Sequence, residues 1–341
     1  CDCAAKRLED AMSECCSAAG REGEHSRIGR DHPVITSRGK PAEVVAVKGG
    51  ESFVGTNDPV IAADGEGPAR RAIVGDFFLE TEAVTNARFA DFVAATGYVT
   101  EAETFGCAAV FSHLLTQKTN AAQSVGATPW WVRVPGAIWK MPEGPESSID
   151  DRLDHPVTQV SSNVAVAFAA WVGGRLPTEA EWEHAARGGN RRRRYPWGDE
   201  EPTDEKIFCN IWQGHFPHCN SLADGFLGTA PVRSFAPTED GFYNFSGNVW
   251  EWSADPFRVR SLSRQAKMRN QEARKNVDKV LKGGSFLCHT SYCYRYRIAA
   301  RMGLSADSAS SNAGFRIAYD NHPSDVGVQR SQAVEVMSTP V

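Results

Sequence analysis

The sequence predicts an irregular α+β fold with little regular secondary structure, and three observations support this. Short apolar runs between residues 44 and 82 alternate with Gly, Asp and Pro, a pattern typical of short strands and long turns. Three segments between residues 85 and 188 have the apolar spacing of amphipathic helices. Residues 195–256 are dense in Trp, Phe, Gly, Asn, Asp and Pro, which predicts long loops held by aromatic packing or bound ions.

The first elements in order are short strands and one helix. The predicted strands cover Val44–Val47, Ile73–Val74 and Phe77–Leu79. The first helix begins at Thr85 or Asn86 and ends at Gly97, because a polar cap precedes the periodic segment and glycine stops it. Its inward face is formed by Phe89, Phe92, Val93 and Thr96.

Two further helices have clear boundaries. One opens at Ser161–Asn163 and ends at Gly173-Gly174, and its i, i+3, i+4, i+7 positions are Val164, Ala167, Phe168 and Trp171. The next begins with a capping box of Thr178 and Glu181 and ends at Gly188. Its apolar face is formed by Trp182, Ala185 and Ala186. The basic stretch 258–282 predicts a solvated surface helix or insertion.

Composition bounds the class of protein. The 341 residues are 41% hydrophobic and 23% charged with a net charge of -5, so the chain presents no broad positive field for nucleic acid or anionic lipid. Its longest apolar stretch, Val164–Val172, is far shorter than the roughly 20 residues of a membrane span. We expect a flexible leader over 1–42, a single domain over 43–322 and a flexible tail over 323–341.

The cysteines divide between leader and body. Of the nine, four lie in the predicted leader: Cys1, Cys3, Cys15 and Cys16. The chain opens on Cys1 instead of Met, so we expect it to be processed, trimmed or a fragment of a longer chain. Pairing of Cys209 with Cys219 stays open, because sequence does not supply the short Cα separation that a disulfide needs. The run Arg191–Arg194 is interpreted as an exposed loop and not as a nucleic-acid signal.

Cys288 and Cys293 carry the strongest chemical signal. They are five positions apart, which is the wrong period for one helix face or one strand face, so a loop must bend them together if they act jointly. A bent pair of thiols indicates a disulfide bond or a soft metal ion. From spacing alone, a structural disulfide or two buried thiols remain the competing interpretations.

Six segments, taken in order, resemble the formylglycine-generating enzyme (sulfatase-modifying factor) family. They are GRLPTEAEWEHAARGG (174–189), YPWGDE (195–200), CNIWQGHFP (209–217), DGFLGTAPV (224–232), GNVWEW (247–252) and LKGGSFLCHTSYCYRYR (281–297). The resemblance runs from about Val44 to Tyr319 and implies that family's irregular fold, within the C-type-lectin-like superfamily, with long loops pinned by calcium. The wider superfamily shares the RLPTEAEWE and GNVWEW segments without one activity, whereas the C-H-x-S-Y-C core belongs to the oxidase.

The resemblance implies a copper-dependent protein oxidase. Such an enzyme uses O2 to convert a cysteine in a C-x-P-x-R motif of an unfolded or nascent sulfatase to Cα-formylglycine, releases sulfide, uses an external thiol reductant and so activates the sulfatase. Breaking an unactivated Cβ–H bond with O2 requires a redox-active centre. Two thiolates without a cluster of imidazoles or carboxylates suit Cu(I).

Roles for individual residues follow from the same resemblance. Cys288 and Cys293 would bind Cu(I), Ser285 and His289 would flank it, and Trp250 would wall the site. Residues matched to substrate binding or its support are Arg301, Asn312, Trp130, Trp131, Cys107 and Tyr292. Family members also bind Ca²⁺ through oxygen ligands on loops. One matching set is Asn210, Ile211, Asp224 and Phe226, and the other is Asn244, Gly247, Val249 and Glu251. The alternative is that these Asn and Asp side chains cap turns.

Two further expectations concern function and compartment. The rival function is a non-catalytic paralogue that acts as a sulfatase-interacting or carbohydrate-binding module, which we would expect to lack the thiol pair. Vertebrate secretory members carry two disulfides and a glycosylated asparagine at positions that here are Ala169, Ala186, Ile298, Ile317 and Ala94. This favours a bacterial-like cytoplasmic enzyme, with the endoplasmic reticulum lumen as the alternative because of the Cys1-x-Cys3 leader.

Overall fold

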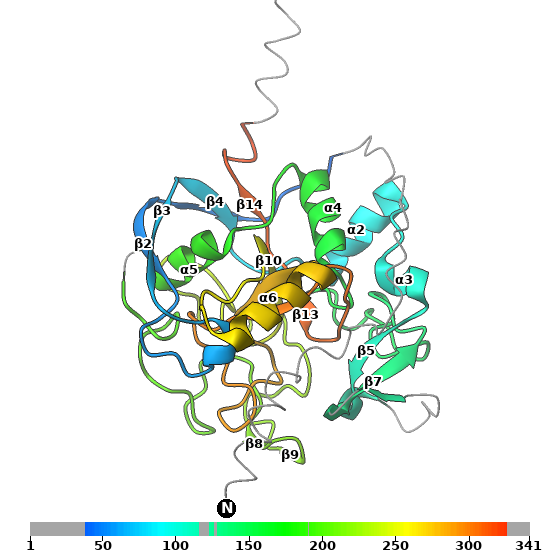
Figure 1. Cartoon of the computed structure of the whole chain (residues 1–341). Coiled ribbons are helices and arrows are strands. Elements are labelled where there is room, and N and C mark those ends of the chain that lie inside the picture. Colours follow the sequence, from blue (N-terminus) through cyan, green and yellow to red (C-terminus); the bar gives the residue numbers. More distant parts are fainter. Residues whose placement is uncertain (1–37, 116–122, 126–127, 190, 326–341) are drawn as a thin grey trace, which may run out of the picture.

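The computed structural model describes residues 38–115, 123–125, 128–189 and 191–325. Most of the predicted leader and tail, and all four leader cysteines, lie outside the described residues. Short helices and small sheets are joined by long loops (Figure 1), so the predicted irregular α+β fold is confirmed.

The first predicted strands form two small sheets. β1 (Val44–Val47) and β14 (Ala318–Tyr319) pair antiparallel on either side of β4 (Phe77–Glu80), which unites segments from opposite ends of the described chain. β2 (Gly50–Val54) and β3 (Arg70–Val74) form an antiparallel pair beside them. These contacts bury Phe77 and Leu79, the two ends of the apolar run that predicted a strand.

The three predicted helices have the expected boundaries. α2 (Asn86–Thr96), α4 (Ser162–Val172) and α5 (Glu179–Arg187) each have a side-chain N-cap and end at a left-handed glycine. The Thr178–Glu181 capping box forms both of its hydrogen bonds. A further short helix, α3 (Glu101–Phe105), was not predicted, because five residues are too few to show a period.

A four-stranded sheet carries the functional region and was not predicted. Its order is β12 (Met302–Ser305), β11 (Asp278–Lys282), β10 (Trp250–Pro256) and β13 (Ala313–Gly314). In β10, Glu251 pairs with Lys282 of β11 on one side and with Gly314 of β13 on the other. The loop that leaves β11 therefore starts one strand away from β13, with β10 between them.

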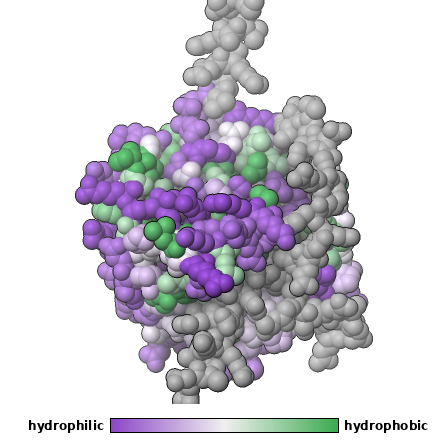
Figure 2. All heavy atoms as spheres, viewed as in Figure 1, coloured by the Kyte–Doolittle hydropathy of each residue, from purple (hydrophilic) through white to green (hydrophobic). Residues whose placement is uncertain are grey.

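The remaining elements lie around these sheets. A third sheet has the order β5 (Cys107–Phe111), β7 (Thr128–Pro135) and β6 (Gln123–Val125). The single turns η1 (Ala62–Asp64) and η2 (Ser112–Leu114) and the two-residue strands β8 (Gly214–His215) and β9 (Cys219–Asn220) complete the described elements. The basic stretch contains α6 (Arg264–Asn276), and Figure 2 shows a hydrophilic band across the face of the molecule where this surface helix lies.

The main hydrophobic core reaches from the helices to the functional region. It joins Phe89 of α2 and Phe168 of α4 to Trp250 and to both cysteines of the 288–293 loop. The loop is therefore anchored in the centre of the domain. None of the helices in the described part of the chain is long and apolar enough to cross a membrane.

Candidate functional site: a buried pair of thiols

The structure brings Cys288 and Cys293 together. Their Sγ atoms lie 2.9 Å apart, which exceeds the about 2.05 Å of a disulfide bond, so the pair is present as thiols. Both residues are almost completely buried, with 0% and 1% of their surface exposed. The pair is thus held close without a covalent link.

Two consecutive turns produce this approach. The backbone N–H of Cys288 donates to the carbonyl of Ser285, and that of Cys293 donates to the carbonyl of His289, each at 2.9 Å. The loop enters through Gly283 and Gly284, whose φ angles of 91° and 72° favour glycine. The carbonyl of Cys288 also accepts a hydrogen bond from the backbone of Trp212 at 3.1 Å.

Ser285 and Asn312 fix the start of the loop. The side-chain amide of Asn312 donates to Ser285 Oγ at 3.0 Å, while the Ser285 backbone N–H donates to Cys288 Sγ at 3.4 Å. The carbonyl of Asn312 accepts from the backbone of Trp250 at 2.8 Å, which ties β10 to the same cluster. Trp250 is fully buried, and its indole N–H has no acceptor among the described residues.

The buried guanidinium group of Arg295 contacts the sulfur of Cys293. Arg295 Nη1 is 3.5 Å from Cys293 Sγ, and its Nε pairs with Asp64 at 2.6 Å. Burial raises the pKa of Asp64, and Arg295 acts against that shift. Arg295 therefore contacts both the Cys293 sulfur and the Asp64 carboxylate.

Aromatic side chains form one wall beside the loop. Tyr292 stacks on Phe216 with ring centroids 3.9 Å apart, and its hydroxyl accepts from Trp130 Nε1 at 2.7 Å. Phe216 also packs edge-on against Trp212. Trp130 is half-buried, whereas Trp131 is only 1% exposed and belongs to the core. Of the two tryptophans matched to the groove, only Trp130 presents surface to a peptide.

The three remaining predicted site residues are His289, Cys107 and Arg301, and they differ in burial and in their partners. His289 is half-buried with Nδ1 2.7 Å from Ser291 Oγ, and burial lowers its pKa. Cys107 is half-buried at the first position of β5. Arg301 is 6% exposed, pairs with Glu179 at 2.7 Å and donates to the carbonyl of Arg258. The side chain of Arg301 is therefore held inside the protein by Glu179.

The donor set matches a soft ion. Among the described residues, no group of three or more His, Cys, Asp and Glu side chains is arranged to hold a metal ion. The 288–293 loop offers two converging sulfurs, and sulfur ligands suit soft ions better than hard cations.

The first predicted calcium set has the features of a cation site. The Asp224 carboxylate lies beside Gln213 Nε2 at 3.2 Å, and burial raises its pKa. Buried side-chain oxygens of Asn210 and Gln213 have no hydrogen-bond donor among the described residues. An unpaired amide oxygen on Gln213, whose amide contacts the desolvated Asp224 carboxylate, is compatible with a hard cation.

The second predicted calcium set is different. Both oxygens of Glu251 accept from Arg316, at 2.6 and 2.7 Å, and one also accepts from Trp182. Asn244 leaves its buried amide oxygen without a donor among the described residues. Because Arg316 already balances the Glu251 charge, this set fits a cation poorly.

Sequence reasoning missed Asp64, Trp212 and Phe216. Each is far from the loop in sequence, and its role appears only once the chain is folded. The short CNIWQGHFP segment was the only signal for the two aromatic residues. Cys209 is buried and Cys219 is exposed, and both are present as thiols.

Comparison with known proteins gives a consistent result. Residues 31–321 match the model of the sulfatase-modifying factor enzyme 1-like domain. The chain is 46% identical to the formylglycine-generating enzyme of Mus musculus, over 90% of this chain and 86% of the relative. Identity is 50% to the enzyme of the same name from Thermomonospora curvata, covering 83% and 96%.

Other relatives widen the picture. An inactive Cα-formylglycine-generating enzyme 2 of Bos taurus is 41% identical, over 82% of this chain and 89% of that protein. Among solved structures, PvdO from Pseudomonas aeruginosa aligns with a TM-score of 0.54 at 20% identity, covering 82% of this chain and 95% of PvdO. That likeness concerns the fold.

Proposed function

The chain belongs to the sulfatase-modifying factor enzyme 1-like family, and on this premise we propose that it oxidises a cysteine in unfolded sulfatases to Cα-formylglycine. The target segment would be of the C-x-P-x-R type, with Cu(I) as cofactor and O2 as co-substrate. Two equivalents of an external thiol, oxidised to a disulfide, would supply the electron pair that reduces the second oxygen atom to water. The products would be the aldehyde, sulfide, water and the disulfide of the external thiol.

The observation that carries the proposal is the buried thiol pair. The two sulfur atoms lie 2.9 Å apart in the buried core, so both could serve as ligands of one soft metal ion. When bound there, Cu(I) would supply the redox chemistry with O2 that side chains lack. A substrate cysteine would add a third sulfur ligand.

The surrounding residues would prepare the pair. Arg295 lies 3.5 Å from Cys293 Sγ and supports that side of the pair, while the hydrogen bond from Asn312 holds Ser285 and with it the first turn of the loop. The wall of Trp130, Phe216 and Tyr292 gives a bound peptide an apolar surface and excludes water. We further propose that Ca²⁺ at Asn210 and Asp224 pins the 209–228 loops.

A non-catalytic paralogue is the second candidate, because inactive relatives share 41% identity with this chain. The retained thiol pair and its buried supporting contacts favour the oxidase. A binding module would not require two sulfurs to converge in the core.

One experiment separates the two. The Cu(I)-loaded protein is incubated in air with a thiol and a C-x-P-x-R peptide, and the aldehyde is followed by mass spectrometry. We expect turnover, with loss of at least about 100-fold in Cys288→Ser and Cys293→Ser, and no change in Cys219→Ser, whose thiol is exposed. Turnover that persists in both serine variants would refute the assignment.

A further inference from the structure

A basic cavity has a lining that includes none of the residues 288–293 of the thiol loop. It measures about 690 Å³ and is formed by the β2–β3 pair, the C-terminal end of α5 and the loop that contains the four consecutive arginines. Phe53, Gly55 and Thr56 of the β2 side contribute to its lining. Its arginines are Arg71, Arg187, Arg191, Arg192, Arg193, Arg194 and Arg297.

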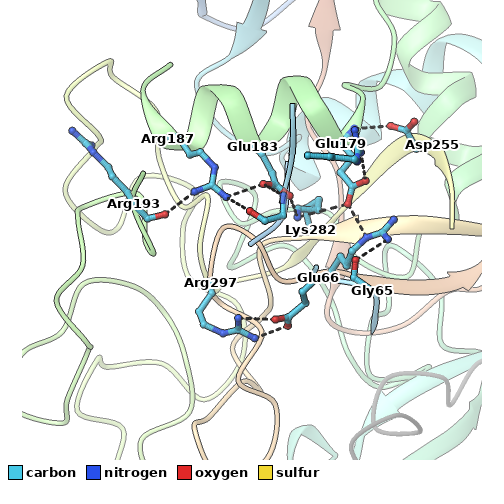
Figure 3. A network of polar contacts seen from close by, with 12 residues as sticks. Gly65, Glu66, Glu179, Glu183, Arg187, Arg193, Asp255, Lys282 and Arg297 are labelled. Atoms are coloured by element: carbon cyan, nitrogen blue, oxygen red, sulfur yellow. Dashed lines mark hydrogen bonds and ion pairs between the residues drawn. The ribbon is translucent and has the colours of Figure 1, made fainter. Parts of the chain in front are cut away.

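The two most buried arginines of the cavity are already neutralised. Arg187 pairs with Glu183 at 2.9 Å, and Arg297 makes a two-pronged pair with Glu66 at 2.5 and 2.9 Å. Figure 3 shows both pairs and the carbonyl of Arg193 that accepts from Arg187. These contacts fix the guanidinium groups in place before any ligand arrives.

Three further arginines of the cavity, the exposed Arg191 and Arg194 and the half-buried Arg193, are only partly neutralised. Arg191 and Arg193 share the single carboxylate of Glu239. Arg194 has only a loose contact with Asp58, at 3.8 Å.

Two more cationic side chains have no acidic partner at all within the described residues. Arg71 is exposed and forms no ion pair there, and Arg192 is likewise exposed and lies over the ring of Phe53 at 4.8 Å. The cavity thus gathers seven guanidinium groups against four carboxylates. The cavity therefore has a local excess of positive charge, although the net charge of the whole chain is -5.

We propose that this cavity is a binding site for a small ligand that carries at least two negative charges on phosphate or sulfate groups. Arginine forks bind such oxyanions through paired, charge-assisted hydrogen bonds. The volume lies within the range of about 300–1,000 Å³ that small-molecule sites occupy. The convergence of the arginines on one cavity, in a chain that is acidic overall, favours a compact ligand over a nucleic acid, which needs an extended basic surface.

Calorimetric titration of the full chain with pyrophosphate, at constant ionic strength, tests the proposal. We expect one saturable site per chain. Arg71→Gln and Arg192→Gln should each weaken binding by about threefold to tenfold, because each removes a charged donor that no carboxylate engages. Glu239→Gln should strengthen binding severalfold, because it releases Arg191 and Arg193.

Controls make the outcome unambiguous. Arg264→Gln removes an exposed arginine on α6 that does not line the cavity, and it should leave affinity unchanged. Thermal melting checks that each variant is folded. Sulfate and inorganic phosphate, titrated separately, show which oxyanion is preferred. Absence of pyrophosphate binding, or equal affinity in the wild type, Arg71→Gln and Arg192→Gln, overturns the proposal. Tighter binding of DNA or of an oligo-aspartate peptide through the same arginines overturns the small-ligand assignment.

Discussion

Lys282 Nζ lies 2.7 Å from Oε1 of Glu183, and neither side chain is exposed. Lys282 ends β11, directly before the loop that holds the two thiols, and Glu183 comes from the middle of α5. Glu183 also accepts from Arg187 (Figure 3). It accepts a further hydrogen bond from the backbone of Gly55. The pair therefore ties the strand that leads into the site to a helix and to the β2 edge.

Removing Lys282 should destabilise the fold. Lys282→Met leaves Glu183 with one cation instead of two in a buried setting, and breaking such a pair costs about 3 kcal/mol. The measurement is the free energy of unfolding from denaturant titration. Lys48→Met is the matched control, since Lys48 pairs with Asp76 at the surface with side chains 86% and 65% exposed. We expect the control to change stability by less than about 1 kcal/mol. Equal losses in the two variants would contradict this account.

Glu181 should make stability depend on acid pH. Burial raises the pKa of this carboxyl, but Arg175 and the backbone of Thr178 outweigh burial and hold it below its ordinary value of 4.5. Because the folded-state pKa is lowered, the stabilisation is present above about pH 4.5 and is lost as pH falls through the folded-state value. Glu181→Gln should therefore cost about 1–2 kcal/mol at pH 7 and progressively less in acid. Unfolding free energies at several pH values check this, with exposed Glu146→Gln as the control. A cost that is constant with pH would exclude the mechanism.

Asn312 should act on the thiols through Ser285. Asn312→Ala removes the 3.0 Å hydrogen bond to Ser285 Oγ and frees the turn that positions Cys288. Loss of a supporting contact of this kind typically lowers metal affinity by about 10–100-fold. Competition titration with a Cu(I) chelator measures the change, and the rate of thiol alkylation in the metal-free protein gives an independent readout. Asn163→Ala, whose amide makes only a long 3.4 Å contact with Glu101, should match the wild type in both assays.

The helices could be predicted because their signals are local. Thr85, Ser161 and Thr178 each cap a helix within three residues, and glycine follows each C-terminus in the left-handed region. The strands β10 to β13 could not be predicted in this way. Trp250 lies opposite Ala313 because distant segments pair, and the chain around either residue shows no regular alternation.

In the candidate site, too, the features that are local in sequence could be predicted and the contacts between distant residues could not. Cys288 and Cys293 are close in sequence, so the need for a bend was readable from their spacing. The contact between Arg295 and Asp64 joins residues 231 positions apart, and no local pattern reveals it. The ion pair between Glu251 and Arg316 likewise joins residues that are distant in sequence. For this reason the two predicted calcium sets looked alike in the sequence but differ in the structure.

Calcium should stabilise the protein through the first set. The amide of Gln213 contacts Asp224, and the amide oxygens of Gln213 and Asn210 have no hydrogen-bond donor among the described residues, so a hard cation bound to these oxygens would relieve their desolvation. A ligand present at about 100 times its dissociation constant adds about 2.7 kcal/mol, which raises the melting temperature by several degrees. We expect added Ca²⁺ to raise, and a chelator to lower, the melting temperature of the wild type, and neither to affect Asp224→Ala. Asn244→Ala should keep the response, because Arg316 already neutralises Glu251 in the second set. If Asn244→Ala abolishes the response and Asp224→Ala keeps it, the cation belongs to the second set.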